Sequence, residues 1–274
     1  MTAAAAALAV LAITPAAAGD RAYDVAVATA RDGPRPAAGA AERRAHIDMR
    51  RRFVDAGLAV EVQRFGVRGR GRSRNVIGIL DTPRDCLRIV MAHTDTTPNA
   101  PGANDNASGL GALAELAPRL RSLEPGCDVW LVATGAEERI YTGSPDHLGA
   151  LALARLVKRR GLAGRLRYAL SLDEVGRDRP FWLRSPVRAQ RRAVEREILA
   201  AARAERVAAS WVRDEGSGNS DHREFELLGM RGAKLGVGAD GEPCRHSPCD
   251  RAGRLKRSSL RAALLVVERA LRRP

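Results

Sequence analysis

Two periodicities of apolar residues alternate along the chain and predict strands and helices in turn. Short apolar runs predict strands over Ala59–Phe65, Asn75–Leu80, Cys86–Ala92, Val129–Thr134, Leu166–Leu172 and Ala233–Val237. Apolar residues at helical spacing predict helices over Ala40–Ala56, Ala107–Leu120, His147–Arg160, Gln190–Ala204 and Ser258–Arg272. Strands that alternate with helices of about ten or more residues form crossover units. The pattern therefore predicts an α/β fold with a mainly parallel sheet covered on both faces.

The length of the chain, 274 residues, suits one large α/β domain. The pattern shows neither a repeat nor a long linker, so we expect a single domain over residues 19–274. Residues 1–18 read as a signal peptide, with an apolar core at Ala3–Ile13 and a small-residue cleavage site at Ala16-Ala17-Ala18. No Lys or Arg precedes that core, which leaves open a misassigned start codon or an ordinary Ala-rich helix. The apolar run is too short for a stable membrane span, and we expect a secreted or otherwise extracytoplasmic protein.

A formal net charge of +14 is typical of proteins that bind nucleic acids or anionic surfaces. The basic residues are nevertheless scattered along the chain, and aromatic residues make up only 4% of it. No long basic block interleaved with aromatic residues is present in the sequence. We therefore expect no specific nucleic-acid partner, and attribute the charge to a solvated, arginine-rich surface.

Cysteine usage agrees with export. The chain has four cysteines, Cys86, Cys127, Cys244 and Cys249, and an even count in an exported protein predicts two disulfides. Cys244 and Cys249 are close enough in sequence to close a small loop. Cys86 and Cys127 each stand at the start of a predicted strand, so they would face each other if those strands are neighbours. Four buried thiols are the alternative.

Histidine and carboxylate side chains follow several predicted strands directly. His93, the pair Glu137-Glu138, and Asp173 each lie just past the end of a strand. The carboxyl ends of parallel strands meet at one edge of the sheet, where open α/β folds bind their ligands. Side chains that are far apart in the sequence can therefore share one site.

The loop 91-MAHTDTTPNAPGANDNASG-109 holds the densest set of these groups. Its Asn, Gly and Pro residues are ordinary turn formers. In extended backbone His93 and Asp95 point to the same side, so Asp95 can accept a hydrogen bond from the imidazole nitrogen that does not bind metal. Asp105 stands just before a predicted helix, and by position alone it is either a helix cap or a metal ligand.

Two more segments add potential ligands. In Gly135-Ala136-Glu137-Glu138 one glutamate can bind metal while the other acts as a general base, and spacing does not decide which. His246 lies between Cys244 and Cys249, where a disulfide would hold it. Two histidines with several carboxylates suit a pair of Zn²⁺ ions.

The segments HTDTTPNAPGANDNASG, GAEE followed by GS, SLDEVG and CRHSPCD, in that order, resemble those of the co-catalytic di-zinc aminopeptidases of peptidase clan MH, especially the secreted bacterial ones. The resemblance runs from about Ala40 to the C-terminus. It implies a three-layer α/β/α sandwich around a mixed, mainly parallel sheet. It also implies two Zn²⁺ ions per chain, one bound by His93 and Asp173, the other by Glu138 and His246, with Asp105 bridging both.

The same resemblance implies the catalytic roles. Asp95 would orient His93, and Glu137 would be the general base that takes a proton from the water between the two zinc ions. A disulfide around the last ligand histidine occurs in secreted members of the family, as Cys244 and Cys249 would form here. Ser220-Asp221-His222 resembles a segment near the family's substrate pocket. We expect these residues to support the site rather than to bind metal.

The resemblance predicts a secreted zinc aminopeptidase, a hydrolase that removes N-terminal residues from peptides, and we expect it to be a monomer. One departure is that no tyrosine follows Asp173, although many family members use a tyrosine there to stabilise the oxyanion. The chain is also too short for the dimerisation domain of related carboxypeptidases. Two rival functions stay open, a glutaminyl-cyclase-like acyltransferase with a single zinc ion and a non-catalytic binding module that uses the positive charge.

Overall fold

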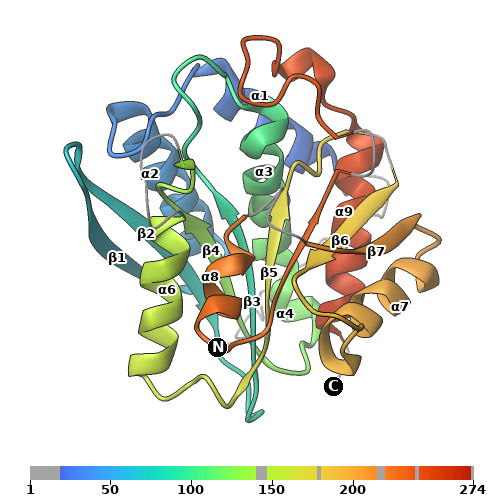
Figure 1. Cartoon of the computed structure of the whole chain (residues 1–274). Helices are drawn as coiled ribbons and strands as arrows, with labels where there is room; N and C mark the ends of the chain where they lie inside the picture. Colours follow the sequence, from blue (N-terminus) through green and yellow to red (C-terminus); the bar gives the residue numbers. More distant parts are fainter. Residues whose placement is uncertain (1–18, 140–146, 178–179, 215–219, 238–240, 273–274) are drawn as a thin grey trace, which may run out of the picture.

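An eight-stranded mixed sheet forms the centre of the computed structural model, in the order β1-β2-β4-β3-β5-β8-β6-β7 (Figure 1). The structure describes residues 19–139, 147–177, 180–214, 220–237 and 241–272. The strands are β1 Ala59–Val67, β2 Gly71–Leu80, β3 Leu87–His93, β4 Asp128–Thr134, β5 Leu166–Asp173, β6 Phe181–Ser185, β7 Ala209–Arg213 and β8 Gly232–Gly236. Four neighbouring pairs, β4–β3, β3–β5, β5–β8 and β6–β7, are parallel, while β1–β2, β2–β4 and β6–β8 are antiparallel. The expected mixed, mainly parallel sheet is confirmed.

Helices cover both faces of the sheet and complete the three-layer α/β/α sandwich. They are α1 Asp20–Arg31, α2 Ala40–Asp55, α3 Ser108–Leu116, α4 Leu120–Leu123, α6 Leu148–Arg159, α7 Glu197–Ala204, α8 His222–Leu227 and α9 Arg257–Leu271. One core cluster joins a face of the sheet to α1, α2, α3, α7 and α9. A second cluster joins the other face to α6 and α8 (Figure 1).

Strand β3 shows why the middle of the sheet reads as a continuous apolar run. Ile89 and Met91 belong to the cluster under α6 and α8, whereas Val90 and Ala92 belong to the cluster on the opposite face. Successive side chains of a strand point to opposite faces. Because helices bury both faces here, Ile89–Ala92 are all apolar before the strand ends at His93. Arg88 of the same strand is buried as well and forms an ion pair with Glu197 of α7.

The elements expected from the sequence are present with small shifts at their ends. The predicted helix Ala107–Leu120 is divided, since α3 ends at Leu116 and Pro118 follows, which cannot donate the next helical hydrogen bond. The predicted helix Gln190–Ala204 begins two residues late, with an irregular turn over Arg192–Arg196 before α7. The strand expected over Ala233–Val237 is shifted back by one residue.

Four elements have no counterpart among the predicted ones. Strands β6 and β7 have five residues each, and helix α8 has six, which is too short for a reliable periodic signal. Helix α1 is different, because its buried residues Ala22, Val25, Ala26 and Ala30 have helical spacing. The sequence therefore contained a readable signal for α1, directly after the presumed leader.

Both expected disulfides are present. The bond Cys86–Cys127 joins the residues just before β3 and β4, which are adjacent parallel strands with Leu87 opposite Asp128. The bond Cys244–Cys249 closes a loop around His246. The expected leader, residues 1–18, lies outside the described residues. Within the described ranges, no helix combines the length and the apolar character that crossing a membrane requires.

Candidate active site

Three neighbouring parallel strands, β4, β3 and β5 (Figure 1), bring His93, Asp173 and the pair Glu137-Glu138 to one edge of the sheet. His93 is the last residue of β3 and Asp173 the last of β5. Glu137 and Glu138 follow β4, whose last residue Thr134 pairs with His93. The sheet topology therefore places side chains from distant parts of the sequence together, as the sequence predicted.

Asp105 faces two histidine–carboxylate pairs, and a further group of potential ligands, His93, Glu137 and Glu138, does not include it. The Oδ1 atom of Asp105 is 3.1 Å from His93 Nε2, and Asp173 Oδ1 is 3.6 Å from the same nitrogen. Its Oδ2 atom is 3.3 Å from His246 Nε2, which lies 3.1 Å from Glu138 Oε2. Each oxygen of Asp105 thus faces one histidine–carboxylate pair.

The buried oxygen atoms of the site fit a bound cation. In each of the groups His93–Asp105–Asp173 and Asp105–Glu138–His246, ligand atoms lie within 4.8 Å of one another. Asp173 Oδ1 and Glu138 Oε1 are buried and have no hydrogen-bond partner in the described structure. A buried carboxylate oxygen without a donor is costly, and a metal ion would satisfy it. Imidazole with carboxylate is a ligand set that suits zinc.

The pair Glu137-Glu138 lies in a largely desolvated environment. Burial raises the pKa of Glu138 to about 7, and the nearby Asp105 carboxylate acts in the same direction. Burial is also the largest cause of the raised pKa of Glu137; the neighbouring carboxylates add to it, while His93 opposes it. A carboxylate whose pKa lies closer to neutrality is a stronger general base.

Asp95 contacts His93, but its carboxylate has a second task. The atom nearest to His93 Nδ1 is the backbone carbonyl oxygen of Asp95, at 3.1 Å, whereas its Oδ1 is 3.7 Å away. The two carboxylate oxygens accept the backbone N–H groups of Glu137 and Glu138, at 2.9 and 3.1 Å. Asp95 therefore links the strand end with His93 to the loop that carries both glutamates.

Further residues that the sequence did not single out hold the loop around Asp105. Arg35 is fully buried and donates to the carbonyl oxygens of Thr94, Pro101 and Gly102. The Asp250 carboxylate accepts the N–H groups of Asn104 and Asp105. The spacing of apolar residues marks neither Arg35 nor Asp250, although Asp250 directly follows Cys249 of the disulfide. The expected turn residues behave as turn residues: Asn106 accepts the N–H of Gly109, and Ser108 donates to the carbonyl of Asn104.

A buried lysine was also missed. Lys234 Nζ lies 2.7 Å from Asp173 Oδ2 and 3.4 Å from Glu174 Oε2. Glu174 also pairs with Arg245, the residue before His246. The oxygen of Asp173 that contacts Lys234 is not the one that faces His93. A lone lysine inside the apolar segment Ala233–Val237 was a readable signal of a buried ion pair, since lysine is rarely buried without a partner.

The segment Ser220-Asp221-His222 lies beside the site and contributes no atom to the two ligand groups. Asp221 accepts a hydrogen bond from Thr134 at the end of β4, Ser220 contacts Ser171, and His222 faces Asp214. The supporting role expected for this segment stays a prediction. Of the tyrosines, Tyr168 is buried in the core, Tyr23 lies under Arg257, and Tyr141 lies outside the described residues.

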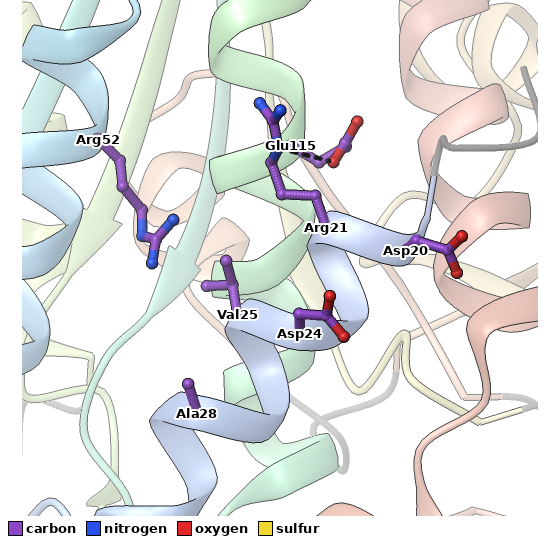
Figure 2. A pocket seen from close by; sticks show the side chains of 7 residues that line it. All are labelled: Asp20, Arg21, Asp24, Val25, Ala28, Arg52 and Glu115. Carbon is purple, nitrogen blue, oxygen red and sulfur yellow. Dashed lines mark ion pairs between the residues drawn. The ribbon is translucent and has the colours of Figure 1, made fainter. Parts of the chain in front are cut away.

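A separate hollow of about 460 Å³ lies between α1, α2 and α3 (Figure 2). It is lined by Asp20, Arg21, Asp24, Val25, Ala28, Arg52 and Glu115. Figure 2 shows Glu115 on α3 facing Arg21. The distance from Arg21 Nε to Glu115 Oε2 is 3.9 Å. None of the predicted site residues lines this hollow, so Glu115 is a buried glutamate outside the candidate active site.

His46 packs behind the site and should make the stability of the protein pH-dependent. Thr94 Oγ1 donates to the carbonyl of Thr134, so the His46 ring, 2.9 Å from Oγ1, must be the donor in their hydrogen bond. Burial, assisted by Arg74, lowers the pKa of His46 from 6.5 to about 4. Between these values the unfolded chain binds a proton that the folded chain does not. Stability from this group is therefore complete above pH 6.5 and is lost as the pH falls towards 4, by about 3 kcal/mol.

Urea unfolding at several pH values measures this effect. We expect the unfolding free energy of the wild type to fall by about 3 kcal/mol more than that of His46→Gln between pH 7 and pH 4. Glutamine keeps a donor for Thr94 and has no proton to gain. Parallel pH profiles of the two proteins would show that His46 is not the group responsible.

Comparison with known proteins matches most of the chain to one family. The model of peptidase family M28 matches residues 75–271. Aminopeptidase YwaD of Bacillus subtilis (strain 168) is 39% identical over 90 residues, which are 30% of this chain and 20% of that protein. The aligned part therefore spans only about a fifth of that relative.

Solved structures share the fold over nearly the whole chain. The zinc aminopeptidase BSAP from Bacillus subtilis superposes with a TM-score of 0.80 at 19% identity, covering 92% of this chain and 93% of that one. A glutaminyl cyclase from Bacteroides thetaiotaomicron gives a TM-score of 0.80 at 19% identity, covering 93% and 98%. At such identities the likeness concerns the fold, which both activities share.

Proposed function

The chain belongs to peptidase family M28, and from this membership we propose that it is a zinc-dependent aminopeptidase that hydrolyses the N-terminal peptide bond of peptides. The observation that carries the proposal is the position of Asp105. Its two carboxylate oxygens face two separate histidine–carboxylate pairs, with Glu137 buried alongside. A single-metal site would need only one such pair.

We assign the residues of the site as follows. His93 and Asp173 would hold one zinc ion, Glu138 and His246 would hold the other, and Asp105 would serve as a ligand to both. When bound, a zinc pair polarises the substrate carbonyl and lowers the pKa of a water molecule by several units. The carboxylate of Asp95 accepts the backbone N–H groups of Glu137 and Glu138, which holds the base and the ligand beside it in place.

Glu137 is the general base of this proposal. Its side chain takes a proton from the attacking water and then gives that proton to the leaving amine, so it ends the cycle in the state in which it began. The desolvation that raises its pKa favours proton uptake from water and still permits its release to a more basic amine.

A direct assay tests the proposal. Purified protein supplied with zinc should hydrolyse aminoacyl nitroanilides, lose this activity when treated with a chelator, and regain it when zinc is restored. Protein that is folded and zinc-loaded but hydrolyses none of a panel of such substrates would refute the aminopeptidase assignment.

The glutaminyl cyclase fold neighbour defines a second candidate. A cyclase would convert N-terminal glutamine of a peptide into pyroglutamate with release of ammonia, and would hold one zinc ion. Ammonia release from a glutaminyl peptide, with about one zinc per chain, would favour it. Asp105 favours the hydrolase, because its two carboxylate oxygens face two different histidines.

We also propose that the protein acts outside the cytoplasm. The two disulfides support this, because such bonds persist in oxidising compartments. Cell fractionation of the native host, followed by N-terminal sequencing of the protein, would locate it and show whether the chain begins at residue 19.

A further inference from the structure

His147 lies between two carboxylates that belong to different elements. Its Nε2 is 3.5 Å from Glu137 Oε1, and its Nδ1 is 3.3 Å from Glu224 Oε1. All three side chains are buried. Histidine 147 precedes α6, Glu137 follows β4, and Glu224 belongs to α8, so three separate segments converge on one imidazole.

The backbone holds His147 against the loop that carries Glu137. The N–H groups of His147, Leu148 and Gly149 donate to the carbonyl oxygens of Glu137, Ala136 and Gly135, at 3.3, 2.9 and 3.0 Å. Gly149 must be glycine, because a Cβ atom there would collide with the carbonyl oxygen of Gly135. The start of α6 and the glutamate loop therefore form one unit, which fixes the distance between His147 and Glu137.

The two ring nitrogens of His147 contact different carboxylates, and each contact has its own role. Glu224 faces Nδ1 and fixes the rotation of the ring, as a carboxylate does for a histidine in many catalytic sites. The opposite nitrogen, Nε2, then points at Glu137. A carboxylate that must meet a water molecule at a defined place gains from such a fixed neighbour, since a displacement of about 1 Å can cost 10²-fold in rate.

We propose that His147 is a positioning residue for the base Glu137, and that Glu224 anchors the His147 ring. This inference rests on the proposed aminopeptidase function. It extends that function by adding two residues that touch neither ligand group, and that no motif in the sequence singled out.

Paired variants at position 147 test the proposal. His147→Leu removes both ring contacts, whereas His147→Gln keeps a polar amide that can reach Glu137. His147 has a positive φ of 49°, so the two replacements, neither of which is branched at Cβ, meet the same backbone strain and form a matched pair. On an aminoacyl nitroanilide we expect kcat of His147→Leu to fall by about 10²-fold with little change in KM. His147→Gln should recover most of this loss.

Two controls separate positioning from folding. Zinc content of each purified variant, measured by elemental analysis, should equal that of the wild type. Glu224→Gln removes the anchoring charge and should lower kcat, while Glu115→Gln, in the hollow of Figure 2, should leave kcat unchanged. If His147→Leu does not fold, the comparison of Glu224→Gln with Glu115→Gln decides the question alone.

The outcomes distinguish this inference from the function on which it rests. A zinc-loaded wild type without peptidase activity would contradict both the proposed aminopeptidase function and the positioning role of His147. An active wild type with unchanged kcat in His147→Leu or in Glu224→Gln overturns the positioning role only. Equal losses in His147→Gln and His147→Leu, or a loss of zinc together with activity, would likewise overturn it, because the effect would then be structural.

Discussion

Replacing Glu137 by glutamine should lower kcat by about 10²–10⁴-fold, the usual contribution of a positioned acid–base group. Glutamine has nearly the same shape, so the contacts of the surrounding backbone remain. It cannot take up a proton from the attacking water at neutral pH, and it has none to give to the leaving amine. Steady-state kinetics on an aminoacyl nitroanilide, with zinc content measured on the same sample, test the expectation.

The zinc measurement makes the result specific for the base. Glu137→Gln should bind as much zinc as the wild type, because Glu137 is not one of the five proposed ligands. Glu115→Gln is the matched control, a buried glutamate outside the site. Full activity of Glu137→Gln would show that another group removes the proton. Lost zinc would instead assign Glu137 to the ligands and leave Glu138 as the candidate base.

The site could be predicted from the sequence where polar residues directly follow the apolar run of a strand. At His93 the apolar run of β3 gives way to polar residues that are still buried, since His93, Thr94 and Asp95 are at most 1% exposed. The same change marks the ends of β4 and β5. The order of these strands in the sheet was not readable in the same way, yet any parallel arrangement would place their carboxyl ends at one edge. The clustering of His93, Glu138 and Asp173 therefore followed from the pattern alone.

The residues that the sequence did not reveal act through long-range contacts. Arg35 is only one of many arginines, and nothing local distinguishes it from those on the surface. Its role comes from burial against the carbonyl oxygens of Thr94, Pro101 and Gly102, some 60 residues away in sequence. His147 and Glu224 likewise meet only because α6 and α8 cover the same face of the sheet. Such pairings depend on tertiary structure, which periodicity does not specify.

Substitution of Asp105 should have the largest effect on metal binding, because the proposed arrangement makes it common to both ions. Asp105→Ala should lose both zinc ions. Asp105→Asn has a single amide oxygen, so it should retain at most one. Asp173→Ala and Glu138→Ala each remove a ligand from one group only and should each lose a single ion. Elemental analysis after equilibration with zinc and removal of the free metal measures all four ratios.

The comparison among these variants is more informative than the loss of activity. Activity of Asp105→Ala should fall by at least about 10³-fold, since the metal pair is expected to supply several kcal/mol of transition-state stabilisation; the single-ion variants should also be impaired. Only the zinc ratios separate a bridging carboxylate from an ordinary ligand. If Asp105→Ala retained one zinc ion, like Asp173→Ala, Asp105 would belong to one group alone. The contacts of its second oxygen with His246 would then have to be explained without a shared metal ligand.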